Sequence, residues 1–197
     1  MKSFYLLFGK QYKIMPFART YNELESDSSL VLQLSNLNEA PFKMKLLKIC
    51  TDANNQIETS DLSEITNLWE DYLPNNLAWP LMSYNLKYII EKNLTGLEGL
   101  EWVSVIVETK ISSRNYFIPK FKNKLDVLDI KNTIYVKGTD NIVKPAFEFE
   151  KVKNYSVFHK PGSYWKIPFA FYVNENIMKQ IRYQKIQCVG FEKVSVN

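Results

Sequence analysis

The chain has few side chains whose types and spacing could do chemistry. Its one histidine, His159, follows the apolar run at residues 155–158. A lone His at the end of a strand is more often a hydrogen-bonded structural residue than a catalyst, and we favour that interpretation. Carboxylates that follow one another, such as Glu70 and Asp71, could act as acid and base, but on a helix surface such pairs are usually only solvated.

The two cysteines, Cys50 and Cys188, each lie in an apolar run with no second Cys or His close by. This spacing suits neither a disulfide framework nor a zinc site. We therefore expect buried, reduced thiols. Free thiols are typical of a reducing compartment, and we expect a cytoplasmic protein.

The sequence contains no nucleophile elbow of the form Gly-x-Ser-x-Gly and no glycine-rich phosphate loop, and it has only six glycines. Its acids lack the spacing of a calcium loop. We therefore expect no enzyme and no catalytic, cofactor-binding or metal-binding residues. The apolar stretch 4–9 is too short for a secretory signal, and no run approaches the roughly 18 apolar residues of a membrane span, so we expect no membrane partner.

Charge is unevenly distributed along the chain. Residues 1–100 hold 9 Lys and Arg against 12 Asp and Glu, whereas residues 101–197 hold 16 against 9. Within the first part, residues 20–71 hold 3 basic and 10 acidic side chains. These acids form either ordinary solvated surfaces or an acidic face that steers a basic partner. The basic second half leaves nucleic-acid binding as an alternative, although its lysines are scattered along strand-like segments.

Aromatic side chains are the other residues that could bind a partner. Trp69 lies near a Pro-containing connection, and Tyr164 and Trp165 lie in the loop between Pro161 and Pro168. These rings either close the core or anchor an interface, since Trp and Tyr are large and need little side-chain ordering.

Hydrophobic periodicity and turn signals predict an α+β fold with a mostly antiparallel or mixed sheet and a few helices. Residues 11–29 are expected to be irregular. Strands are predicted at 3–8, 31–34, 42–49, 102–107, 115–118, 125–128, 133–136, 147–150, 155–158 and 188–196. Helices are predicted after Asp61, which has capping-box spacing to Glu64, and after the caps Ser83 and Asn174.

A helix–strand unit occurs twice. Residues 79–106 align with 170–197 at a constant offset of 91 without a gap, which pairs Asn85 with Asn176 and Gly99 with Gly190. The matched positions are caps, apolar helix positions, turns and alternating strand residues, and this indicates an internal duplication. Because neither copy can bury its apolar face alone, we expect both helices to pack on one shared sheet. We predict an acidic α+β portion at 1–78 and a duplicated portion at 79–197, together forming one compact domain.

Several of these residues resemble a group of bacterial polymorphic-toxin immunity proteins. The similar motifs are Trp79-Pro80, Ser83-x-x-Leu86-x-x-x-Ile90, Gly99-x-Glu101-Trp102, Val105, Tyr116-Phe117, Leu125-Asp126-Val127-Leu128-Asp129, Tyr155-Ser156-Val157-Phe158, Phe171-Tyr172-Val173-Asn174-Glu175 and Gly190-Phe191-x-x-Val194. The resemblance covers about residues 79–197, and residues 1–78 match poorly. His159 stands where the family often has Arg.

The resemblance implies a non-enzymatic α+β protein that binds and neutralises a cognate bacterial toxin. Toxin nucleases tend to be basic, so the acidic region 20–71 is our candidate contact surface, with the aromatic loops as possible anchors. The candidate partner-binding residues are Glu23, Glu25, Asp27, Trp69, Glu70, Asp71, Tyr164 and Trp165. Two alternatives stay open: an enzyme that uses carboxylates with His159, and a nucleic-acid-binding module that uses the basic second half.

Overall fold

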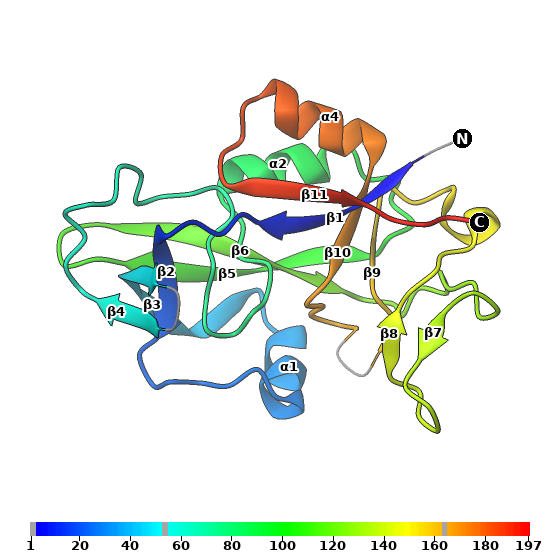
Figure 1. Cartoon of the computed structure of the whole chain (residues 1–197), viewed down its shortest axis with the longest axis horizontal. Helices are drawn as coiled ribbons and strands as arrows, with labels where there is room; N and C mark the ends of the chain where they lie inside the picture. The colour runs from blue at the N-terminus through cyan, green and yellow to red at the C-terminus, as the bar shows by residue number, and fades with distance from the viewer. Residues whose placement is uncertain (1–2, 53–54, 163–164) are drawn as a thin grey trace.

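A computed structural model of the chain describes residues 3–52, 55–162 and 165–197. These residues form eleven strands and four helices in an α+β fold (Figure 1). The strands are β1 (Phe4–Gly9), β2 (Ile14–Thr20), β3 (Glu39–Asp52), β4 (Asn55–Thr59), β5 (Leu100–Glu108), β6 (Ser113–Phe121), β7 (Ile134–Tyr135), β8 (Ile142–Lys144), β9 (Val157–His159), β10 (Phe171–Asn174) and β11 (Val189–Lys193). The helices are α1 (Ser28–Ser35), α2 (Tyr84–Glu91), α3 (Phe149–Val152) and α4 (Glu175–Tyr183).

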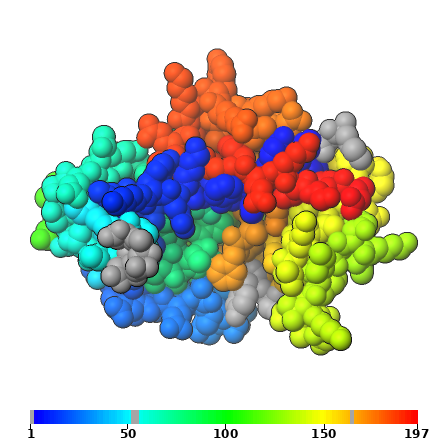
Figure 2. Space-filling model, in the orientation of Figure 1, coloured from blue at the N-terminus to red at the C-terminus, as the bar shows by residue number. Residues whose placement is uncertain are grey.

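Two main sheets organise the molecule. One has the order β11-β1-β10-β9 and is antiparallel throughout. The other has the order β2-β3-β5-β6, with β4 also paired to β3, and its β3–β5 pair is parallel. Antiparallel pairing with one parallel pair confirms the predicted sheet type. Strands from residues 1–78 enter both sheets, and the first strand pairs with the last, as the blue and red segments lying side by side in Figure 2 show.

Each sheet buries its own apolar core. In the first core the rings of Phe147, Phe158 and Tyr172 lie 4.8–5.1 Å apart, beneath α2 and α4. The second core contains the alternating residues Val103 and Val105 of β5, with α1 packed against them. Alternation along β5 therefore produces a half-buried strand, because its other residues face the opposite side of the sheet.

The two predicted caps are confirmed. Ser83 Oγ accepts a hydrogen bond from the Leu86 N–H at 3.2 Å and opens α2, and Asn174 Oδ1 accepts from the Ile177 N–H at 2.9 Å and opens α4. Each cap satisfies one of the N–H groups that the first helical turn leaves without a partner. The helices pack against one another, and the side chain of Asn93 after α2 bonds to Gln180 on α4.

Two predictions for residues 11–34 are wrong. Residues 31–34 lie in the helix α1, where Asp27 Oδ1 accepts from the Leu30 N–H at 2.8 Å. Leu30, Val31 and Leu34 then share one buried face. A short apolar run fits either a strand or a buried helix, and here the cap decides. The segment 11–29, expected to be irregular, contains the strand β2, which pairs with β3 over seven residues.

The helix predicted after Asp61 is also absent: residues 61–71 form turns and bends. Asp61 Oδ1 accepts from the N–H of Ser63, two residues on, and Asn67 Oδ1 does the same for Trp69. These local bonds compete with helix formation, so acceptors that resemble caps build turns instead.

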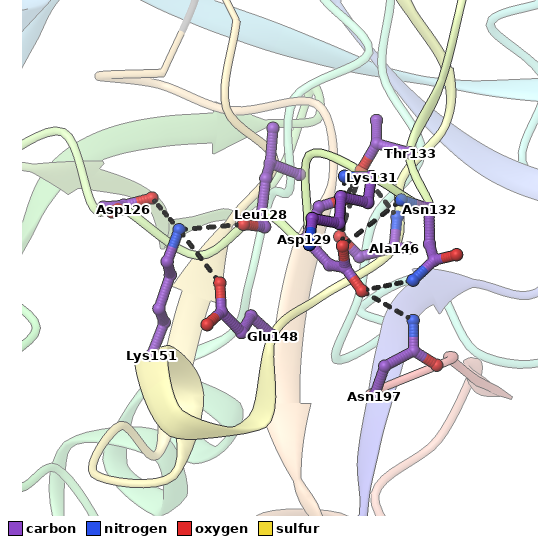
Figure 3. Close-up of polar contacts among 10 residues, drawn as sticks. All are labelled: Asp126, Leu128, Asp129, Lys131, Asn132, Thr133, Ala146, Glu148, Lys151 and Asn197. Atoms are coloured by element: carbon purple, nitrogen blue, oxygen red, sulfur yellow. Dashed lines mark hydrogen bonds and ion pairs between the residues drawn. The ribbon is translucent and has the colours of Figure 1, made fainter.

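The strands predicted at 125–128 and 147–150 do not form; Leu128 and Phe147 make only an isolated bridge, and α3 begins at Phe149. Polar side chains hold this region (Figure 3). The Asp129 carboxylate accepts from the side chains of Asn132 at 2.6 Å and Asn197 at 3.0 Å, and these bonds lower the pKa of Asp129. The C-terminal residue is thereby tied to the turn at 129–133.

The strands of the two helix–strand units lie in different sheets, β5 in the second and β11 in the first. The helices α2 and α4 nevertheless bury their apolar residues in one shared core, as expected for the helices but not for the strands. The matched glycines also differ physically. Gly99 has a φ of +61°, which favours glycine, whereas Gly190 lies under Phe8, where a Cβ would come within 2.4 Å of the ring. A matching sequence pattern thus serves two different local structures.

Loss of the Asn174 cap should destabilise the protein. The side chain is buried, and its amide also donates to Ser156 Oγ at 3.1 Å. We expect Asn174→Ala to lower the free energy of unfolding by about 1–2 kcal/mol in urea denaturation, and Asn174→Asp, which keeps the capping oxygen, to cost less. Equal losses for both variants would show that the cap contributes little.

Candidate binding groove

A groove with a volume of about 760 Å³ lies at the start of β6. Four segments enclose it: the loop 66–71, the first turn of α2, residues 114–116 of β6, and the loop 184–187 that joins α4 to β11. Polar and aromatic side chains line it. They include Asn67, Trp69, Asp71, Tyr84, Asn85, Arg114, Asn115, Gln184, Lys185 and Gln187.

Asp71 holds three of these segments together. Its backbone C=O accepts from the Ser83 N–H at 2.8 Å, and its Oδ1 accepts from Ser83 Oγ at 2.6 Å. Its Oδ2 accepts from the Gln187 N–H at 3.0 Å. Asn67 adds a second link by donating to Gln187 Oε1 at 2.8 Å. The groove therefore has a shape set by hydrogen bonds between segments far apart in the chain.

Trp69 and Arg114 form one wall. The Arg114 Cζ lies 5.2 Å from the centre of the Trp69 ring, and the ring of Tyr116 lies 6.5 Å behind it. The buried Tyr116 hydroxyl donates to the backbone C=O of Glu70 at 2.7 Å. This bond fixes the loop that carries Trp69. Trp69 is half-buried against the second core, and the exposed Arg114 over its ring adds a modest attraction.

Two tyrosines of α2 continue the aromatic surface from the groove. Tyr84 is 62% exposed and Tyr88 45%, and their rings stack at 6.2 Å. Lys92 Nζ lies 5.2 Å from the Tyr88 ring, and Tyr84 also contacts Phe117 of β6. Large rings at this exposure, on the side of α2 away from its buried residues, leave considerable apolar area in contact with solvent.

The sequence predicts Glu70 on an acidic contact surface. This prediction is wrong, because Glu70 is buried, at 6% exposure. Burial raises the pKa of its carboxyl, and Glu70 Oε2 has no hydrogen-bond partner in the described part of the chain. Burial together with the neighbouring Glu70 carboxyl raises the pKa of the Cys188 thiol to about 12. Both cysteines are free, as predicted, but they are half-buried rather than buried.

Glu23, Glu25 and Asp27 are exposed as predicted, but they lie away from the groove. They precede or cap α1, which Figure 1 places at the opposite side of the molecule from α2 and α4. Other acids of the region 20–71 are paired with bases, Glu58 with Arg19 and Glu64 with Lys48. The structure thus brings Trp69 and Asp71 together and separates them from the acids around α1.

The sequence predicts two aromatic anchors in the loop between Pro161 and Pro168. Of these, Tyr164 lies outside the described residues. Trp165 is half-buried against the ring of His159, at 5.8 Å, so it belongs to the edge of the first core. His159 itself is buried; the Leu125 N–H donates to its Nε2 at 3.2 Å, and its Nδ1 faces the C=O of Lys160. Burial lowers the pKa of His159, in keeping with a neutral structural residue.

Sequence reasoning missed Tyr84, Arg114 and Asn115 as groove residues. For Tyr84 a signal existed: together with Tyr88 it forms an i, i+4 aromatic pair outside the buried stripe of Leu86, Ile89 and Ile90. Nothing comparable marks Arg114, since its position over Trp69 depends on how residues 45 apart fold together.

The groove offers hydrogen bonding, aromatic contact and positive charge. In the described ranges, no group of three or more His, Cys, Asp or Glu side chains is arranged to hold a metal ion. None of the described helices combines the length and the apolar character needed to span a bilayer. No known family model and no curated protein matches this chain.

Replacing Glu70 by Gln should stabilise the protein more at high pH than at low pH. Because the folded pKa of Glu70 is raised, the folded state holds the proton more tightly than the unfolded state. The wild type therefore has its full contribution below the unfolded pKa of about 4.3 and loses stability as pH rises through the folded pKa. Thermal unfolding from pH 4 to 8 should show the difference between variant and wild type growing with pH. The exposed Glu25→Gln should show no such growth, and a constant difference for Glu70→Gln would contradict the burial argument.

Proposed function

We propose that this chain is an immunity protein that binds a cognate bacterial toxin and neutralises it without catalysis. The observation that carries the proposal is the groove at the start of β6, where Trp69, Tyr84 and Arg114 stand around a hydrogen-bonded hollow. The resemblance of residues 79–197 to polymorphic-toxin immunity proteins supplies the kind of partner.

The composition of the groove supports binding to a protein. Trp, Tyr and Arg are the residue types most enriched at the energetic centres of protein interfaces, and charged residues other than Arg are depleted there. Asp71 and Asn67 fix the walls before any partner arrives. A preorganised surface loses less conformational entropy on binding, so more of the contact energy becomes affinity.

The exposed acids around α1 support a separate role in the same function. Glu23, Glu25 and Asp27 would raise the rate at which a basic toxin, such as a nuclease, meets this protein. Steering of this kind acts over about 8–10 Å at physiological salt and needs no direct contact. We therefore assign anchoring to the groove and steering to α1.

Two further proposals belong to this account. The protein would act in the cytoplasm, where its two free cysteines stay reduced. The two helix–strand units would descend from one duplicated segment. In support, α2 and α4 begin at residues 84 and 175, one residue after matching caps and at the same offset of 91 that aligns the sequences.

Alanine variants of the groove aromatics test the proposal. The toxin domain encoded beside this chain is co-expressed with it, and survival and binding affinity are measured. We expect Trp69→Ala and Tyr84→Ala each to weaken binding about 10–100-fold, the range for interface anchors. Phe169→Ala is the matched control for Tyr84→Ala, because both side chains are exposed, Phe169 at 46% and Tyr84 at 62%, and Phe169 lies beside β8 rather than in the groove.

Thermal unfolding of each variant shows whether a loss of binding reflects a loss of fold. Full protection by both folded groove variants would remove the groove from the proposal. Failure of the wild type to protect against the toxin domain, together with salt-sensitive binding of an oligonucleotide, would instead favour the nucleic-acid-binding alternative.

A further inference from the structure

One edge of the second sheet is open within the groove. The segment before α2 covers the middle of the β6 edge, where Phe117 and Met82 exchange two hydrogen bonds, of 2.8 Å and 2.9 Å. After Ser83 the chain turns away into α2. The part of β6 that begins at Ser113 therefore extends past its own covering segment.

The pairing of β5 with β6 shows which backbone N–H and C=O groups of β6 point toward the open edge. In an antiparallel pair, residues whose N–H and C=O point toward the partner alternate with residues whose groups point away. Phe117 points away from β5, since its groups bond to Met82. Asn115 and Ser113 have the same parity, so their backbone N–H and C=O also point away from β5. Within the described residues, no bond to another backbone group closes this edge at Asn115.

The side chains around this edge indicate the charge of a partner. Arg114 and Lys185 line the groove, and neither forms an ion pair with another described residue. The one groove carboxylate, on Asp71, already accepts bonds from Ser83 and Gln187. Beyond the edge, Ile111 at the tip of the hairpin is 94% exposed and offers apolar area for an added strand to cover.

We propose that the open edge of β6 receives an extended segment of the toxin, which adds a strand beside Ser113–Asn115 and places a carboxylate against Arg114. This proposal rests on the proposed function and specifies how the partner is held. Backbone hydrogen bonds to the edge supply affinity, and the charge of Arg114 selects an acidic side chain in the added strand. Exposed edges are the usual sites of such pairing, and this edge has the groove walls to orient the incoming chain.

Proline at Asn115 tests the added strand. Proline removes the outward N–H and leaves the bonds between β6 and β5 in place, because the N–H of Asn115 does not point toward β5. The strand already accommodates Pro119, which has the same parity. We expect Asn115→Pro to weaken binding of the toxin domain at least about tenfold, and Asn115→Ala, which keeps the N–H, to bind within about twofold of wild type.

Arg114→Glu tests the acidic segment. It should weaken binding at least about tenfold, whereas Lys137→Glu, a charge reversal in the exposed turn between β7 and β8, should leave binding unchanged. Unchanged binding by Arg114→Glu would overturn the acidic chemistry of the added strand.

The outcomes separate this inference from the proposed function. If Asn115→Pro binds the toxin domain as tightly as the wild type does, strand addition is overturned and the immunity function stands. Equal losses for Asn115→Pro and Asn115→Ala would assign the effect to the side chain and also overturn it. A wild type that does not bind overturns both. If Asn115→Pro unfolds, Ser113→Pro replaces it, since Ser113 has the same parity at the first residue of β6.

Discussion

Asp71 is the main hydrogen-bonding link among three segments that meet at the groove. Its three accepted bonds link the loop 66–71 to Ser83 at the start of α2 and to Gln187 before β11. The first of these segments follows β4 of the second sheet, and the last leads into β11 of the first sheet. A buried or half-buried acceptor with several donors is costly to remove, because each donor then lacks a partner. The groove has its described shape because Asp71 accepts these bonds through its carboxylate and its backbone C=O, with Asn67 adding a further link to Gln187.

Two adjacent acids therefore have different roles. Asp71 faces the groove and accepts hydrogen bonds, whereas Glu70 points into the protein beside Cys188 and has its pKa raised by burial. Only the backbone C=O of Glu70 serves the groove, as acceptor for Tyr116. A buried carboxyl with one oxygen lacking a partner reduces stability at neutral pH, and Glu70 lies in the same loop as Trp69, so this loop is a place where the protein departs from maximal stability. Functional surfaces are where such departures are expected.

The sequence predicts the helix caps Ser83 and Asn174, because capping depends only on neighbouring residues. A side-chain acceptor followed by an apolar stripe is sufficient to open a helix. The same reasoning failed at Asp61 and missed Asp27, since an acceptor before apolar residues can also close a turn. The open edge of β6 was beyond prediction. It depends on the pairing of Met82 with Phe117 and on contacts between residues 71 and 187, and these are set by the tertiary fold rather than by either segment.

The separation of the acids around α1 from the aromatic groove leads to a direct test. Hydrogen exchange can be compared between the free protein and the protein mixed with the proposed toxin partner. We predict that the amides of Ser113 and Asn115, which point away from β5, and those of the loop 66–71 become protected in the complex, while residues 23–27 exchange at nearly the same rate as in the free protein. Protection centred on residues 23–27, with the start of β6 unchanged, would contradict the account.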